Sequence, residues 1–86
     1  MRVTVLCFAR LRDLAGVHEW TCEVGDDATV HDVWQALVDA NPAVAVMSGA
    51  VSAAVNAEFV TLNTPVRAGD EVAFLPPVSG GAGTHP

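Results

Sequence analysis

The sequence has 86 residues, of which 51% are apolar, enough for a single domain with a compact core. Ten carboxylates against four arginines and no lysine give a net charge of −6, which argues against nucleic-acid binding because a phosphate backbone would be repelled. The longest mostly apolar run, residues 43–55, is shorter than the roughly 20 residues that span a bilayer. Without a signal peptide or a membrane segment, we expect a cytoplasmic protein.

The first part of the chain predicts two strands joined as a hairpin. Residues 2–9 alternate and are rich in β-branched side chains, and residues 17–24 alternate again. Between them, residues 11–16 are typical of a short turn closed by Gly16. One face of the first strand carries three small apolar side chains, Val3, Val5 and Cys7.

A helix is predicted to begin at Thr29. Thr29 and Asp32 form a capping-box pattern, in which each side chain satisfies a free N–H of the first turn. Asn41 and Pro42 end the helix, and residues 43–47 could form a short second one. Its apolar side chains recur at helical spacing: Val30, Val33, Trp34, Leu37 and Val38.

The second half of the chain predicts three more strands, at residues 50–55, 59–62 and 71–75. A turn at residues 56–58 joins the first two of these, and a loop at residues 63–70 leads to the last. Pro76 and Pro77 stop the final strand because proline cannot continue a ladder of hydrogen bonds.

The element order β-β-α-β-β-β indicates an α+β fold, a two-layer roll with one main helix across a mixed sheet. The β-grasp arrangement fits this order, with the first and last strands expected to be parallel and central. We assign residues 1–78 to this domain and expect residues 79–86 to form a flexible C-terminal tail.

The sequence contains no set of side chains typical of an enzyme. It has no phosphate-binding glycine loop, no HExxH or GxSxG pattern, and no Ser/His/Asp or Cys/His arrangement. Cys7 and Cys22 are interpreted as buried apolar residues. The three histidines lack the spacing of metal ligands, so neither a metal nor a bound cofactor is expected.

The segment after the last strand is the more informative one. Pro76 and Pro77 favour an extended path away from the domain. Gly80 and Gly81 then give the thinnest possible backbone, which can enter a narrow cleft of another protein. On these residues alone, the alternative is that Gly80-Gly81 merely ends a disordered tail.

Strand alternation also predicts an apolar patch on the side of the sheet away from the helix. Leu6, Phe8 and Leu75 would face that side, and Phe59 could join them. Patches of this kind mark surfaces that bind partners. The alternative is that residues 43–47 cover part of this patch.

Three segments together resemble the small, sulfur-carrying subunit of molybdopterin synthase. They are FARLRDLAG at residues 8–16, AAVN at residues 53–56 and GDEVAFLPPVSGG at residues 69–81. The last segment is the most specific, because it joins the strand start, the proline pair and Gly80-Gly81. The resemblance extends from Met1 to Gly81.

The resemblance implies a ubiquitin-like carrier rather than an enzyme. A ubiquitin-E1-like enzyme would use ATP and magnesium to adenylate the carboxylate of Gly81, and a sulfur donor protein would convert the adenylate to a thiocarboxylate. The carrier would then dock on the large synthase subunit, as part of a heterotetramer, and pass sulfur to cyclic pyranopterin monophosphate. Gly80 would allow passage, and partner contacts would involve Phe8, Phe59, Leu75, Pro76, Pro77, Val78 and Ser79.

Two features depart from the family pattern. Leu75 stands where relatives often have phenylalanine, a change that keeps the contact apolar. The chain also continues beyond Gly81 for five residues, 82–86, and an internal glycine has no carboxylate to adenylate. The chain could be a precursor cleaved after Gly81, a diverged copy that carries no sulfur, or a natural protein extended by foreign residues; we favour the precursor.

Other functions stay open at this point. The chain could carry sulfur for thiazole or cysteine synthesis, or be joined to lysines of other proteins as a modifier. It could also be an interaction module that uses the apolar patch and has an inert tail.

Overall fold

The computed structural model describes residues 1–77, so the predicted partner positions Val78 and Ser79 and the pair Gly80-Gly81 lie outside the described residues. Five strands and three helical segments make up the fold. In chain order they are β1 (Arg2–Cys7), α1 (Ala9–Ala15), β2 (Glu19–Glu23), α2 (Val30–Ala40), η1 (Pro42–Met47, a 3₁₀ helix), β3 (Ser52–Val55), β4 (Glu58–Val60) and β5 (Glu71–Leu75).

The strands form one mixed sheet in the order β2-β1-β5-β3-β4. β1 and β5 are parallel neighbours, and every other pairing is antiparallel. The first and last strands therefore lie inside the sheet and are parallel to each other, as predicted. This is the β-grasp arrangement of ubiquitin-like proteins.

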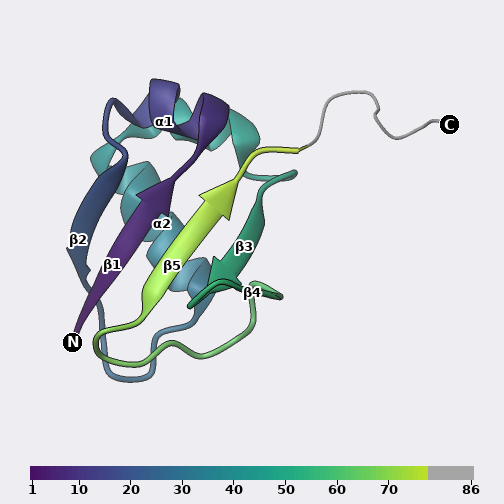
Figure 1. Cartoon of the computed structure of the whole chain (residues 1–86). Helices are drawn as coiled ribbons and strands as arrows, with labels where there is room; N and C mark the ends of the chain where they lie inside the picture. Colours follow the sequence, from purple (N-terminus) through teal and green to yellow (C-terminus); the bar gives the residue numbers. More distant parts are fainter. Residues whose placement is uncertain (78–86) are drawn as a thin grey trace, which may run out of the picture.

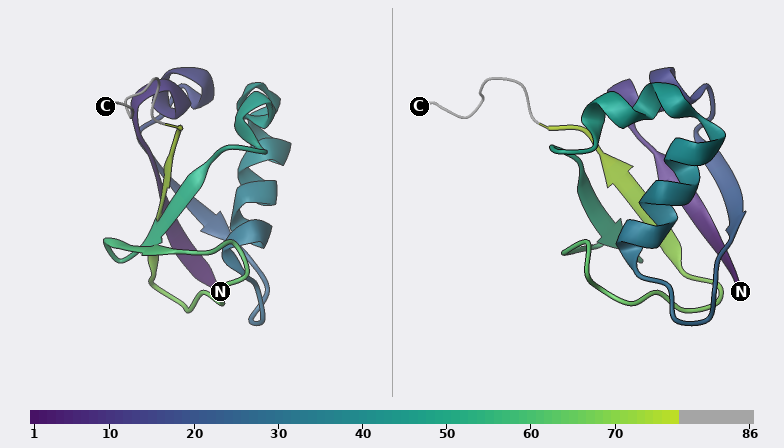
Figure 2. Two further views of the ribbon diagram at one scale, coloured as in Figure 1. Left: turned by 90° about the vertical axis from the view of Figure 1, so that its right-hand side faces the viewer. Right: turned by 180° about the vertical axis from the view of Figure 1, so that it is seen from behind.

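The sheet and the helices form two layers. α2 and η1 lie on one face of the sheet, and α1 lies at the end where β1 and β5 finish (Figures 1 and 2). Figure 1 looks onto the opposite face, which no helix of the described residues covers. We call this opposite face the outer face.

The start of α2 confirms the predicted capping box. The Thr29 Oγ1 atom accepts a hydrogen bond from the Asp32 N–H at 3.4 Å, and the Asp32 carboxylate accepts one from the Thr29 N–H at 2.9 Å. The helix ends at Ala40, directly before Asn41 and Pro42. Its apolar stripe is the part of the helix that packs on the sheet, since Val30, Val33, Trp34 and Leu37 are buried.

The core between the layers is apolar throughout the described residues. The Trp34 ring meets the Phe74 ring edge to face, with 5.1 Å between centroids. Cys7 and Cys22 are free thiols buried in this core, as predicted.

The predicted turn at residues 11–16 is wrong, because Ala9–Ala15 form the helix α1. The helix exists because Leu11 and Ala15, four residues apart, both enter the core. Gly16 ends it in the left-handed conformation, with φ of 76°, and its N–H donates to the Arg12 carbonyl. The element order thus gains a short helix between the first two strands.

Residues 43–47 do not cover the outer face, so that alternative is wrong. These residues belong to η1, which lies on the same side of the sheet as α2 (Figure 2). Val44 is fully buried in the core and fixes η1 there. Within residues 1–77, no helix has the length and the apolar character that crossing a bilayer requires.

Candidate docking face at the end of strand β5

The candidate site begins where β5 ends. β5 lies between β1 and β3, and the Phe8 N–H donates to the Phe74 carbonyl at 3.4 Å just before that end. The chain then leaves the sheet through Pro76, which is half-buried, and Pro77, which is exposed. The exit is therefore fixed between two neighbouring strands, on the edge of the outer face.

Hydrogen bonds at the other end of β5 set its register. The Asn56 side chain accepts from the Glu71 N–H at 3.0 Å and donates to the Asp70 carboxylate at 2.9 Å. The same carboxylate accepts from the Arg67 N–H at 2.8 Å. These contacts explain the Gly-Asp-Glu strand start: Asp70 closes the turn and ties it to the β3–β4 hairpin.

Side-chain alternation along β5 separates the core from the outer face. Val72 and Phe74 are fully buried, whereas Ala73 and Leu75 are half-buried on the other side. The same row continues across the sheet, because Ala73 pairs with Leu6 on β1 and with Ala54 on β3. Ala54 in turn pairs with Phe59 on β4.

These residues form the outer apolar patch. Phe59 is 73% exposed and Phe8 is 36% exposed, so the patch offers two aromatic rings to solvent. Its members are Leu6, Phe8, Ala54, Phe59, Ala73 and Leu75. Their position beside the exit of β5 makes this surface suited to binding a protein that also receives the residues after Pro77.

The structure thus places Phe8, Phe59 and Leu75 on one face, close to where the chain leaves through Pro76 and Pro77; their role as partner contacts stays a prediction. Ala54 and Ala73 were not predicted as members. Small side chains carry little signal by themselves. Alternation along β5 places Ala73 on the side of Leu75, and the pairing of β3 with β5 brings Ala54 into the row.

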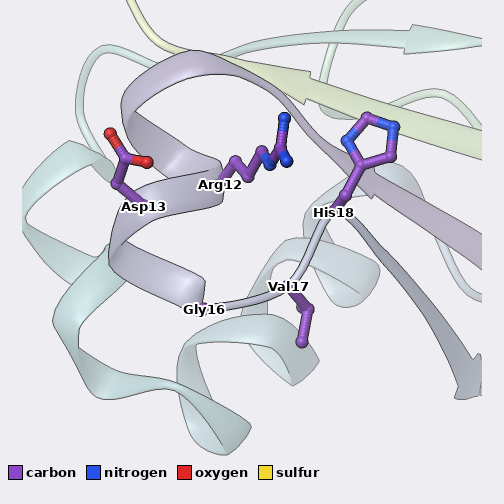
Figure 3. A pocket seen from close by; sticks show the side chains of 5 residues that line it. All are labelled: Arg12, Asp13, Gly16, Val17 and His18. Carbon is purple, nitrogen blue, oxygen red and sulfur yellow. The ribbon is translucent and has the colours of Figure 1, made fainter.

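A hollow of about 370 Å³ lies beside the patch, between α1 and the start of β2. Its lining is polar and contains Arg12, Asp13 and His18, with Gly16 and Val17 (Figure 3). A second hollow, of about 450 Å³, runs between β2 and α2 and is lined by acidic side chains, among them Glu23, Asp32 and Asp39.

The described residues hold no group arranged for covalent chemistry. Burial raises the pKa of the Cys7 thiol, and burial followed by the Glu23 charge raises the pKa of the Cys22 thiol, so neither favours a reactive thiolate. Within residues 1–77, no three His, Cys, Asp or Glu side chains are placed to hold a metal ion. The described residues offer instead an apolar patch beside the exit of β5.

Comparison with known proteins identifies the family of this chain. The ThiS family profile matches residues 5–81. The molybdopterin synthase sulfur carrier subunit of Chlamydomonas reinhardtii is 40% identical, over 94% of this chain and all of that protein. The small archaeal modifier protein 1 of Haloferax volcanii is 38% identical, over 86% of this chain and 94% of its own length.

Solved structures agree with the fold. The crystal structure of SAMP1 from Haloferax volcanii matches with a TM-score of 0.82 at 35% identity, covering 94% of this chain and all of that one. A chain in the complex of subunits 1 and 2 of the molybdopterin-converting factor from Helicobacter pylori matches with a TM-score of 0.66 at 26% identity. The match covers 94% of this chain and all of that chain. With the profile matching nearly the whole chain and the relatives matched over their full length, this chain belongs to the ThiS family of ubiquitin-like sulfur carriers.

Proposed function

We propose that this chain is the sulfur carrier subunit of molybdopterin synthase, with Gly81 as the carrier residue. An E1-like enzyme uses ATP and magnesium to adenylate the Gly81 carboxylate, and pyrophosphate leaves. Sulfur at the oxidation level of sulfide, delivered by a sulfur donor protein, then attacks the acyl carbon; a C–S bond forms, the C–O bond to AMP breaks, and the product is a thiocarboxylate. The large synthase subunit receives this end of the chain and passes the sulfur to cyclic pyranopterin monophosphate.

The observation that carries the proposal is the exit of β5 beside the outer apolar patch. A carrier needs a surface that partners can bind and a terminus that reaches their active sites, and the catalytic side chains can all belong to those partners. The family match ends at Gly81, the residue to which the chemistry is assigned. The name of the Chlamydomonas relative supports molybdopterin synthesis as the pathway.

The proposal requires removal of residues 82–86. Gly81 is followed by Ala82, so its carbonyl belongs to an amide and cannot form an adenylate. Cleavage after Gly81 creates the free carboxylate.

Intact-mass measurement of the chain purified from its host tests the cleavage after Gly81 and the formation of the thiocarboxylate. We expect a species that ends at Gly81, and a further mass increase equal to the exchange of one oxygen for sulfur when the activating enzyme and sulfur donor are present. The matched control is a chain that ends at Gly80, which should fold but transfer no sulfur. A chain found only in full length, and unable to form an adenylate, would refute sulfur carriage.

A second candidate is a protein modifier, joined through Gly81 to lysines of other proteins. The close structural match to SAMP1 favours it. In that case, antibodies to this chain should detect larger conjugates that survive thiol reduction and that contain an isopeptide bond to Gly81. Their absence in cells that hold the thiocarboxylate form would leave sulfur carriage as the function.

A further inference from the structure

The polar hollow beside the outer apolar patch is lined by one cationic side chain, Arg12. The ion pairs formed among residues 1–77 all involve the Met1 amine or Arg2, so the Arg12 guanidinium pairs with no carboxylate of the described part. Arg10 and Arg67 likewise form no ion pair within residues 1–77, and Arg12 differs from them in lining the hollow. Figure 3 shows the Arg12 side chain extended toward His18, while Asp13 points away from both.

His18 also lines the hollow. Its Nδ1 atom lies 3.0 Å from the Cys7 carbonyl oxygen. Because a carbonyl oxygen only accepts, Nδ1 carries the hydrogen and donates, which fixes the ring and, in the neutral imidazole, leaves Nε2 as an acceptor. Arg12 is therefore the side chain of the lining that can donate charge-assisted hydrogen bonds to an anion.

The hollow is continuous with the outer apolar patch through Phe8. The Phe8 and His18 rings meet edge to face, with centroids 5.4 Å apart and an interplanar angle of 83°. A protein that covers Phe8 therefore reaches the rim of the hollow. The arrangement of an apolar centre with a charged rim is typical of protein interfaces.

We propose that this hollow receives a carboxylate side chain of the protein that docks on the outer apolar patch, pairing with Arg12. The inference rests on the proposed function, because it assumes that the large synthase subunit docks there. The Asp13 side chain, which also lines the hollow, points away from Arg12 and His18.

A free anion in solution fits the hollow less well than a carboxylate of a docked protein. The Gly16 N–H already donates to the Arg12 carbonyl at 2.9 Å, so it is not available to an anion. Exposed charge pairs contribute little in water. A carboxylate brought in by a docked protein is held close to Arg12, so its effective concentration is high. Docking also excludes part of the water that would otherwise compete with the ion pair.

The test is calorimetric titration of the host's large synthase subunit with this chain, in full length and ending at Gly81. Arg12→Gln should weaken binding about tenfold. Arg10→Gln is the matched control: Arg10 is exposed on the same helix and loses the same charge, but it does not line the hollow. We expect it to change affinity less than about twofold, and the Arg12→Gln effect to shrink at high salt.

The outcomes separate the inference from the proposed function. Equal losses for both arginine variants would indicate a general charge effect and overturn the inference. An unchanged Arg12→Gln affinity, with Leu75→Glu still abolishing binding, would overturn it and leave the proposed docking intact. Failure of the unaltered chain to bind the large subunit would overturn both.

Two further measurements identify the bound group. Without the large subunit, acetate and phosphate should leave the NMR signals of Arg12 and His18 unchanged at submillimolar concentration; a shift there would indicate a site for free anions instead. Replacing one acidic residue of the large subunit by its amide should weaken binding to the unaltered chain but not to Arg12→Gln. If none of the acidic residues in the interface of the large subunit behaves in this way, the proposal is contradicted.

Discussion

Two apolar side chains of this protein are exposed almost equally, but on different sides of the molecule. Phe59 is 73% exposed and lies on the outer face, whereas Val46 is 75% exposed and lies on η1, on the side of the helices. Exposure alone therefore does not distinguish them. What distinguishes Phe59 is its place in a row of apolar neighbours that leads to the exit of β5.

This contrast gives a direct test of the docking face. Phe59→Glu should weaken binding of the large synthase subunit by about 2 kcal/mol, roughly thirtyfold, because a charge would be buried against an apolar partner surface. Val46→Glu introduces the same charge at an equally exposed position and should leave the affinity unchanged. Titration calorimetry of the two variants checks the prediction; equal losses would contradict the assignment of the face.

The members of the candidate site differ in how far the sequence could reveal them. Alternation along the first and last strands was sufficient to place Phe8 and Leu75 on the outer face. Arg12 and His18 could not be brought together in the same way, because their juxtaposition depends on α1 being a helix and on the turn at Gly16. Contacts made across a short irregular connection depend on tertiary packing.

At the scale of elements, the strong local signals were reliable, and the short second helix suggested for residues 43–47 is present as η1, whereas α1 was missed. The capping box and the five-residue stripe predicted α2, and the proline pair fixed the end of β5. α1 has only seven residues, too few for a helical period to be distinguished from a turn. α1 is stabilised by the burial of Leu11 and Ala15. This burial depends on the packing of the whole core and not on the local sequence.

The β3–β4 hairpin contains backbone strain that a substitution can relieve. Asn56 and Ala57 have φ of 50° and 71°, both in the left-handed region. Asn56 is held there by its hydrogen bonds to Asp70 and Glu71, whereas alanine at the second position has no such compensation.

We therefore expect Ala57→Gly to raise the free energy of unfolding by about 1 kcal/mol. The same substitution at Ala40, which is exposed in the last turn of α2, should lower it by about 0.5–1 kcal/mol, because glycine weakens a helix. Urea denaturation of both variants measures the two changes. A decrease for Ala57→Gly would show that the turn is not strained in solution.

The composition of the whole molecule makes its alkaline behaviour simple. The chain has no tyrosine and no lysine, and arginine stays charged throughout the accessible range. Cys7 and Cys22 are therefore the side chains that ionise as pH rises above neutrality. Both are buried in the core, and burial raises the pKa of each thiol above its ordinary value of 9.0, with the Glu23 charge adding to the effect at Cys22.

A raised thiol pKa in the folded state has a defined consequence for stability. Above pH 9 the unfolded chain loses thiol protons that the folded chain keeps, so the thiol contribution to the free energy of unfolding should be constant below this pH and should fall above it, by up to about 1.4 kcal/mol per pH unit for each thiol. Denaturation with urea at a series of pH values measures this slope. The Cys7→Ala/Cys22→Ala variant keeps the Met1 amine but lacks both thiols, and should lose most of the slope; Cys22→Ala alone should lose part of it. A slope unchanged in the double variant would mean that other groups control alkaline unfolding, and that thiol burial does not couple the core to pH.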